Sequence, residues 1–464
     1  MTAAIRKQSA RKIAVAATAA LALLAPLASA QSTRAEIRAA ITEPGHVPAP
    51  GCVVGTFDRG SPTLLVAQGY ADLAARRALD GDSLFYAASI SKQFTALAAA
   101  TLIAKGDLSL NDDVRTYLPE LPEYDAPVTV GMLMHHTSGI RDSLGLLRMA
   151  GLSDVGKAAK GDALDLLFRQ RDTQFTPGTR YRYSNGGYLL LAEIVERVSD
   201  QAFADYARHA IFAPLGMRSS FFLDDESPRA GNYAHGYVPE DGAFAVRDSF
   251  PRFSGSGGLM LSMNDLARYE YDIARGHRVW TREVARIMLA PGRYSDGSLI
   301  DDGAGLSYGG GLHLGERDGR QVVVHTGSAQ AFRHAYMRLP DQKRAFAVLC
   351  NRGDWKATDR LKAVMAASGV HYPGMPRTRP EGLFHSAELN ANYRLTPTDK
   401  GLRVEVTSPF VEAPVIQFYA ADDDGRFHHQ TMTIAPTDDP DRIRVKRGTT
   451  ADLTLVRIAE STDK

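Results

Sequence analysis

Ser89 and Lys92 are the first residues of this sequence whose types and spacing could perform chemistry. They stand in the stretch FYAASISKQF, residues 85–94, and match the pattern S-x-x-K. Three residues make nearly one helical turn, so the two side chains share one face of a helix. A serine hydroxyl becomes a nucleophile when a base takes its proton, and a lysine can be that base when burial lowers its pKa. The apolar run that follows, TALAAATLIA, predicts such a buried helix over residues 89–105.

The S-x-x-K pattern is not specific by itself. It also occurs as Ser9…Lys12 and as Ser461…Lys464, close to the two ends of the chain. Two further elements follow the first in order, namely Tyr183-Ser184-Asn185 and, at the end of a predicted strand, His325-Thr326-Gly327. The ordered set of three elements is therefore the signal that indicates a function.

The order S-x-x-K, Y-S-N, H-T-G resembles the serine penicillin-recognising enzymes, closest to the branch of class C β-lactamases, DD-peptidases and D-aminopeptidases. A tyrosine in the second element is the habit of class C enzymes, and a histidine in the third is found in some DD-peptidases. The stretches 130–142, 255–270 and 306–312 resemble segments of that family. The resemblance covers about residues 35–370. It implies an α+β fold, in which an antiparallel sheet flanked by helices adjoins an all-helical subdomain and the active site lies between them.

The resemblance also implies a role for each matching residue. Ser89 would attack a carbonyl carbon and form an acyl-enzyme, Lys92 would assist its deprotonation, and Tyr183 would shuttle the proton. Which of Lys92 and Tyr183 is the general base stays open. Asn185 would hydrogen-bond Lys92 and the amide of the substrate. The remaining predicted site residues are His325 and Thr326 on the opposite wall, Gly327 for close approach, and the backbone N–H groups of Ser89 and Ser328 as the oxyanion hole.

His325 departs from the lysine of the related K-T-G element. A lysine in that place is always charged, whereas a histidine titrates near pH 6.5. If His325 faces the carboxylate of a substrate, the activity should change around that pH. Arg317 or Arg320, which lie just upstream, could supply a permanent positive charge instead.

Two pairs of adjacent histidines raise the question of a metal site. His135 and His136 point apart, and neither a carboxylate nor a third histidine follows at a suitable spacing. His428 and His429, beside a run of aspartates, indicate the solvated end of a hairpin. The sequence therefore predicts neither a metal nor another cofactor.

The elements around these residues suggest strands at both ends of the main body and helices between them. Residues 51–72 predict two strands joined by a turn at 59–62. Residues 106–290 are mostly helical in pattern, strands return over 320–350, and a last helix is predicted near 359–368. We therefore expect strands from both ends of this main body to pair in one sheet.

Cys52 and Cys350 are the two cysteines of the chain. In the fold that the resemblance implies, the first strand pairs with the last, and these cysteines would then be neighbours. A disulfide between them is one hypothesis, since export would permit it, and two buried thiols are the other. Titration of thiols in the denatured, unreduced protein would decide between them.

The C-terminal part of the chain predicts a separate domain. A proline-rich stretch over residues 371–380 is typical of a semi-rigid linker. Beyond it, strand-length segments predict an all-β domain over residues 381–464, with a hairpin-type turn at 422–425. The serine hydrolase-like domain would then occupy residues 31–370.

The N-terminus predicts export. Basic residues precede an apolar run over residues 13–27, and the sequence ASAQ follows, which is typical of a signal peptide over residues 1–30 that is cleaved after Ala30. A membrane anchor is the alternative, but the run is short for a span of roughly 20 residues and contains Pro26. We expect a soluble mature protein in the periplasm or outside the cell.

The composition is normal for a soluble globular protein. Apolar residues make up 44% and charged residues 23%, and the net charge of +1 offers no basic surplus for nucleic acid. We expect an exported serine hydrolase that acts through an acyl-enzyme on amide or ester bonds. Its substrate would be a small molecule or peptide, such as a D-Ala-type peptide of peptidoglycan origin, a D-amino-acid amide, an ester or a β-lactam. The alternative is a non-catalytic binding protein on the same scaffold.

Overall fold

The computed structural model describes residues 33–42, 48–224, 232–373, 380–398, 401–421, 426–437, 441–447 and 451–459. The predicted signal peptide over residues 1–30 lies outside the described residues. So do most of the predicted linker, at 374–379, and the predicted turn at 422–425. In the part of the chain that is described, no helix is both long and apolar enough to cross a bilayer.

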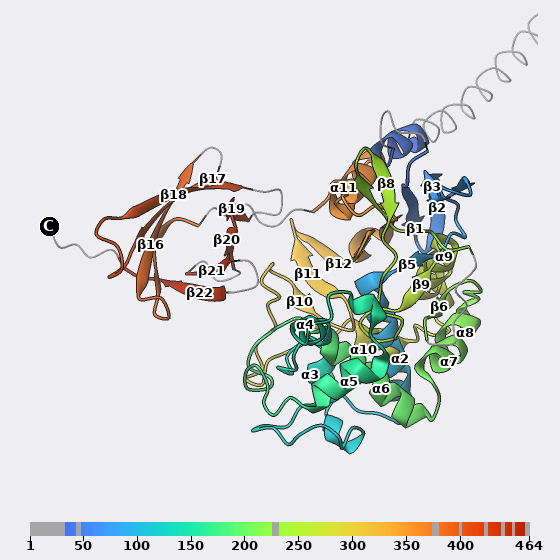
Figure 1. The fold of residues 1–464 in the computed structure, drawn as a ribbon, viewed down its shortest axis with the longest axis horizontal. Helices are drawn as coiled ribbons and strands as arrows, with labels where there is room; N and C mark the ends of the chain where they lie inside the picture. Colours follow the sequence, from blue (N-terminus) through green and yellow to red (C-terminus); the bar gives the residue numbers. More distant parts are fainter. Residues whose placement is uncertain are drawn as a thin grey trace, which may run out of the picture.

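A seven-stranded antiparallel sheet forms the centre of the main domain (Figure 1). The two ends of the domain meet in it, because β1 pairs with β14 and Cys52 lies directly opposite Cys350. A disulfide joins these two residues. The predicted sheet from both chain ends is therefore confirmed. In spatial order the strands are β10 (Ser307–Tyr308), β11 (His313–Arg317), β12 (Arg320–Ala329), β13 (Phe332–Leu339), β14 (Arg344–Cys350), β1 (Cys52–Asp58) and β2 (Ser61–Gln68).

The hairpin of β1 and β2 follows from its turn residues. Arg59 and Gly60 have φ angles of 49° and 75°. Two successive positive φ angles are the requirement of a two-residue turn whose twist matches that of antiparallel strands. The turn lies where the sequence predicts it.

Alternating side chains of β1 divide the core into two layers. Cys52 and Val54 pack on one face, together with the helix over residues 33–40 and with α11 (Ala357–Ala367). Val53 and Phe57 belong to the larger cluster on the other face, which the helical region completes. Figure 1 shows α11 beside the blue start of the domain, and α3, α5 and α6 gathered on the opposite side. The site residues come from this larger side.

The helical region surrounds α2 (Ser91–Lys105), whose residues from Ser91 to Leu102 are all buried. A helix that is buried all round is typical of the centre of a domain. The other helices of this region are α3 (Val130–Met134), α4 (Ser143–Met149), α5 (Lys160–Phe168), α6 (Asn185–Ser199), α7 (Phe203–Ala207), α8 (Ala213–Leu215), α9 (Met263–Tyr271) and α10 (Arg282–Met288). Short strands join distant segments, namely β3 (Tyr70–Asp72) with β4 (Arg77–Ala78), β5 (Phe85–Tyr86) with β9 (Leu259–Leu261), β9 with β6 (Phe221–Phe222), and β7 (Tyr237–Glu240) with β8 (Ala243–Val246).

The C-terminal domain is a closed antiparallel barrel, which confirms the predicted all-β fold. Its last strand pairs with its first, and alternate side chains such as Phe384, Leu395 and Ile434 fill the interior. Where the barrel approaches the main domain, the guanidinium of Arg444 packs against Gly303. The strands are β15 (Gly382–Ser386), β16 (Ala391–Thr398), β17 (Gly401–Thr407), β18 (Val415–Ala421), β19 (Phe427–His429), β20 (Met432–Pro436), β21 (Arg442–Arg447) and β22 (Ala451–Arg457).

Candidate active site

Ser89 lies in a short 3-10 turn, Ala88–Ile90, that leads directly into α2. The predicted helix over residues 89–105 therefore begins two residues later as an α-helix, with the serine in the turn before it. Ala88 has a φ angle of 49°, a conformation that a non-glycine residue rarely adopts and that is often kept at functional sites. Ser89 lines a pocket of about 210 Å³.

The amine of Lys92 is held by hydrogen bonds inside the protein. Nζ lies 2.8 Å from Oδ1 of Asn185, 2.8 Å from the carbonyl oxygen of Ser256 and 3.4 Å from Oγ of Ser89. The side chain is fully buried. Burial disfavours the charged form and lowers the pKa of Lys92 to about 7, although the negative charge of Asp142 opposes this shift. A large share of this lysine is therefore neutral near pH 7.

Asn185 is oriented for this contact by Asp142, a residue to which the sequence analysis assigned no role. Oδ2 of Asp142 accepts hydrogen bonds from the backbone N–H and from Nδ2 of Asn185, at 2.9 Å and 2.7 Å. Its Oδ1 accepts the N–H of Gly145 at 2.7 Å and caps α4. With Nδ2 engaged in this way, Oδ1 of Asn185 faces Lys92.

Tyr183 reaches the serine from the loop before α6. Its hydroxyl lies close enough to the side chain of Ser89 for the serine to influence its pKa, and Nζ of Lys92 lies 4.6 Å from the centre of its ring. Burial raises the pKa of Tyr183 above its ordinary value. The phenol therefore stays protonated near neutral pH and can donate. The structure thus brings together the side chains of Ser89, Lys92, Tyr183 and Asn185.

His325 is placed differently from the sequence-based expectation. Its ring is buried, Nδ1 donates to the carbonyl oxygen of Thr326 at 2.7 Å, and Nε2 accepts from the hydroxyl of Tyr308 at 3.1 Å. Burial, with further contributions from the nearby His313 and Lys92, holds the pKa of His325 well below 6.5. Both nitrogens are used by protein groups in the neutral state. The expected titration of His325 against a substrate near pH 6.5 therefore does not fit the structure.

The residues after His325 bring β12 against the 3-10 turn Ala88–Ile90 that contains Ser89, which we call the serine turn. A Cβ atom on Gly327 would lie 2.6 Å from the carbonyl oxygen of Ala87, so only glycine permits this approach. Thr326 is exposed on the strand, and Ser328 lines the pocket together with Ser89. The two backbone N–H groups predicted to form an oxyanion hole thus belong to residues that line one pocket.

Arg148 is a second residue that the sequence reasoning missed. It lies in the last turn of α4 and lines the pocket, and its guanidinium forms no hydrogen bond or ion pair with another described residue. The proposed alternatives Arg317 and Arg320 do not line the pocket. They face each other at the far end of the β11–β12 hairpin, and Arg320 donates to the carbonyl oxygen of His371 at 3.3 Å. The rest of the pocket wall combines polar side chains such as Ser249 and Gln330 with apolar ones, which include Leu144, Val155, Phe250 and Phe253.

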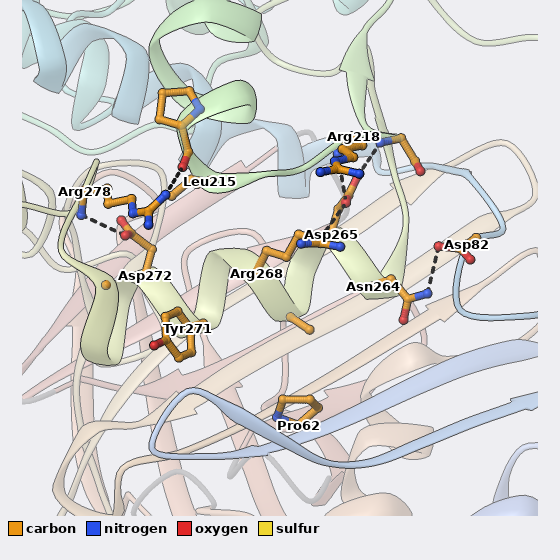
Figure 2. Close-up of a pocket in the computed structure, with 14 residues that line it drawn as sticks. Pro62, Asp82, Leu215, Arg218, Asn264, Asp265, Arg268, Tyr271, Asp272 and Arg278 are labelled. Atoms are coloured by element: carbon orange, nitrogen blue, oxygen red, sulfur yellow. Dashed lines mark hydrogen bonds and ion pairs between the residues drawn. The ribbon is translucent and has the colours of Figure 1, made fainter.

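A larger pocket of about 730 Å³ is drawn in Figure 2, and none of the motif residues lines it. The two buried carboxylates of this pocket accept hydrogen bonds from backbone N–H groups. Asp265 accepts the N–H groups of residues 218–220, and Asp272 accepts those of residues 278–280. Figure 2 shows the bonds from Arg218 and Arg278. These carboxylates hold loops and are not directed at a ligand. Within the described ranges, no group of three or more His, Cys, Asp or Glu side chains could hold a metal ion.

Comparison with known proteins agrees with this geometry. Residues 37–369 match the Beta-lactamase family. A D-aminopeptidase of Brucella ovis is 28% identical over 333 residues, which are 70% of this chain and 61% of the relative. Penicillin-binding protein 4* of Bacillus subtilis is 30% identical over 327 residues, which are 68% of this chain and 70% of the relative. The chain thus spans 61% of the length of that D-aminopeptidase.

Solved structures show the same fold. The octameric penicillin-binding protein homologue from Pyrococcus abyssi superposes with a TM-score of 0.62 at 23% identity, over 88% of this chain and 96% of the other. A D-amino acid amidase from Ochrobactrum anthropi, complexed with D-phenylalanine, superposes with a TM-score of 0.60 at 22% identity, over 73% of this chain and 99% of the other. At these identities the likeness concerns the fold.

Proposed function

Because the chain belongs to the beta-lactamase family, within the serine penicillin-recognising superfamily, we propose that it is an exported serine hydrolase that cleaves amide or ester bonds through an acyl-enzyme on Ser89. The observation that carries the proposal is the 3.4 Å approach of a buried lysine amine, with a pKa of about 7, to the hydroxyl of Ser89 at a pocket.

The hydrogen bonds of Lys92 support the role of general base for this residue. A neutral amine has two N–H donors and one lone pair. The two 2.8 Å bonds, to Asn185 and to Ser256, take the donors, and the lone pair is left to accept the proton of Ser89. Tyr183 is the weaker candidate for the base, since its phenolate is disfavoured by burial.

Acylation would then proceed in one sequence. Lys92 takes the proton of Ser89, and Oγ attacks the carbonyl carbon of the substrate. The backbone N–H groups of Ser89 and Ser328 stabilise the oxyanion, in a role worth roughly 3 kcal/mol per donor in other hydrolases. The hydroxyl of Tyr183 donates its proton to the leaving amine or alcohol and regains one from Lys92. Water then attacks the acyl-enzyme by the reverse set of transfers and restores Ser89.

The pocket wall and the relatives suggest the substrate class. Apolar side chains such as Leu144 and Phe250 would accept an apolar acyl group, and Arg148 would meet an anionic group of the substrate. The similar proteins named D-aminopeptidase and D-amino acid amidase support D-configured amides and peptides as the first candidates to test. Export is supported by the N-terminal sequence pattern and by the disulfide between Cys52 and Cys350, which persists in oxidising compartments.

The test is a comparison of the mature chain from Gln31 with its Ser89→Ala variant. Both would be assayed on D-amino-acid amides, D-Ala-D-Ala peptides, nitrophenyl esters and a chromogenic β-lactam. Intact-mass analysis after treatment with a fluorophosphonate should show one adduct on the native chain and none on the variant. If neither hydrolysis nor labelling depends on Ser89, the chain is a binding protein on this scaffold and the proposal is wrong.

A further inference from the structure

His136 holds the chain on both sides of Tyr183. Its backbone oxygen accepts the N–H of Arg182 at 2.9 Å, and its ring Nδ1 accepts the N–H of Ser184 at 3.1 Å. The tyrosine lies between these two anchors. His136 therefore anchors the backbone N–H groups of the residues before and after the tyrosine, from a different part of the sequence.

The ring of His136 also packs on the tyrosine directly. The two ring centres lie 4.4 Å apart, and Tyr188 and Tyr308 approach the same imidazole at 4.9 Å and 4.6 Å. The ring is buried, and among the described residues Nε2 has no hydrogen-bond partner. Because a backbone N–H can only donate, Nδ1 must carry the lone pair and Nε2 the proton, which then faces aromatic rings.

The backbone of His136 adopts an uncommon conformation that allows both of its hydrogen bonds to the segment around Tyr183. Its φ angle is 60°, in the left-handed region that disfavours most side chains but admits Asn, Asp and His more readily. That conformation lets one residue present both its carbonyl oxygen and its ring nitrogen to the segment around Tyr183. Strained residues of this kind are frequent next to active sites.

We propose that His136 is a positioning residue that holds the hydroxyl of Tyr183 at Ser89, through its two hydrogen bonds to the neighbours of the tyrosine and its contact with the phenol ring. The inference rests on the proposed function, since it concerns the proton transfer assigned to Tyr183. In the sequence, His136 attracted attention only as half of a histidine pair without a metal.

Three variants separate this role from simple packing. In His136→Asn, the side-chain Oδ1 stands where Nδ1 stood and accepts the same N–H, and asparagine tolerates the positive φ. In His136→Gly, the backbone is free but the acceptor is lost. The matched control is His135→Asn at the adjacent histidine, which has no hydrogen bond or ring contact to Tyr183 within the described structure.

We expect kcat to fall about a hundredfold in His136→Gly with little change in KM, since a misplaced catalytic group costs about that much. Partial rescue, to within about tenfold of the native enzyme, is expected in His136→Asn, and native kcat in His135→Asn. Circular dichroism and thermal unfolding identify any variant that does not fold. The positioning role is overturned if folded His136→Gly has native kcat, or if Asn is no better than Gly.

A double-mutant cycle with Tyr183→Phe makes the test specific. If His136 acts through the hydroxyl of Tyr183, adding His136→Gly to Tyr183→Phe should cause less than about a threefold further loss of kcat, because interacting residues are not additive. Equal losses in both backgrounds would overturn the inference while leaving the dependence on Ser89 intact. Activity that is indifferent to Ser89 would instead contradict the proposed function itself.

Discussion

Lys92 and Asn185 share a 2.8 Å hydrogen bond that joins the buried α2 to the start of α6. The amide of Asn185 can offer its oxygen to the lysine because Asp142 takes its nitrogen. The position and the charge of the lysine amine therefore depend on a carboxylate that does not touch the serine.

Replacement of Asp142 by asparagine should change both the rate and its pH dependence. The variant cannot accept all the hydrogen bonds from Asn185 and Gly145, so kcat should fall about tenfold to a hundredfold. The carboxylate raises the pKa of Lys92, so its loss should move the acidic limb of the pH–rate profile to lower pH. Asp165→Asn, which removes an exposed ion pair with Arg169, is the control of equal charge and should leave both quantities unchanged. An unmoved acidic limb would count against the electrostatic link.

The pH profile of the native enzyme should follow Lys92. The base must be neutral, so kcat/KM should rise with pH and level off above an apparent pKa of about 7. Lys92→Arg keeps a permanent positive charge and should lose the activity across the whole range. His325→Asn should lower kcat, because it removes the ring that bonds Tyr308 and the carbonyl oxygen of Thr326. The midpoint of the pH–rate profile should stay the same, because the buried His325 does not titrate in that range. A midpoint that disappears in His325→Asn would restore the expectation drawn from the sequence.

The sequence was informative where chemistry depends on local spacing. The one-turn separation of Ser89 and Lys92 and the turn at Arg59-Gly60 could be anticipated from helix geometry and turn chemistry. That Cys52 and Cys350 are neighbours was implied by the family resemblance, which left the disulfide and two free thiols as alternatives. The ordered motifs also anticipated that Tyr183 comes close to Ser89.

What could not be anticipated depends on tertiary burial and on partners far along the chain. The charge state of His325 follows from Tyr308 and from its burial, neither of which the H-T-G motif reveals. Asp142 and Arg148 lie at opposite ends of a short helix, α4, whose packing no motif specifies. A search for helix-capping aspartates upstream of the Y-S-N element would have found the first of them.

Arg148 should lower KM for substrates that carry a negative charge. As the pocket cation without a protein partner in the described chain, it is expected to contact an anionic group of the substrate. Arg148→Met should raise KM about tenfold for a substrate with a free carboxylate and leave KM for the matched carboxamide unchanged. Arg148→Lys should recover part of the difference, since it restores charge without the bidentate geometry. An equal effect on both substrates would show that Arg148 contributes packing alone.

The disulfide between Cys52 and Cys350 should stabilise the main domain without taking part in catalysis. Thiol titration of the denatured, unreduced protein should detect no thiol, and reduction should release both. A Cys52→Ala, Cys350→Ala double variant should lose about 2–5 kcal/mol in the free energy of unfolding, since the bridge closes a long loop. Urea unfolding with and without reductant measures this difference. The kcat of the folded variant should equal that of the native enzyme, and free thiols in the unreduced native chain would contradict the bridge.

Replacement of Gly327 should abolish most of the activity, because the carbonyl oxygen of Ala87 lies directly opposite it. A methyl group there would meet the carbonyl oxygen of Ala87 at 2.6 Å, and a backbone atom next to the serine turn cannot move aside without moving Ser89. Gly327→Ala should therefore lower kcat by about a hundredfold or more, since displacement of the nucleophile by about 1 Å suffices for such a loss.

Gly315→Ala on β11 is the matched control: its methyl would meet Cδ2 of Leu306 at 2.8 Å, and a leucine side chain can rotate away. Both variants should cost about 1–3 kcal/mol of stability by overpacking. Only the first should lose activity, and equal activities in the two variants would show that the strand does not hold the serine turn in place.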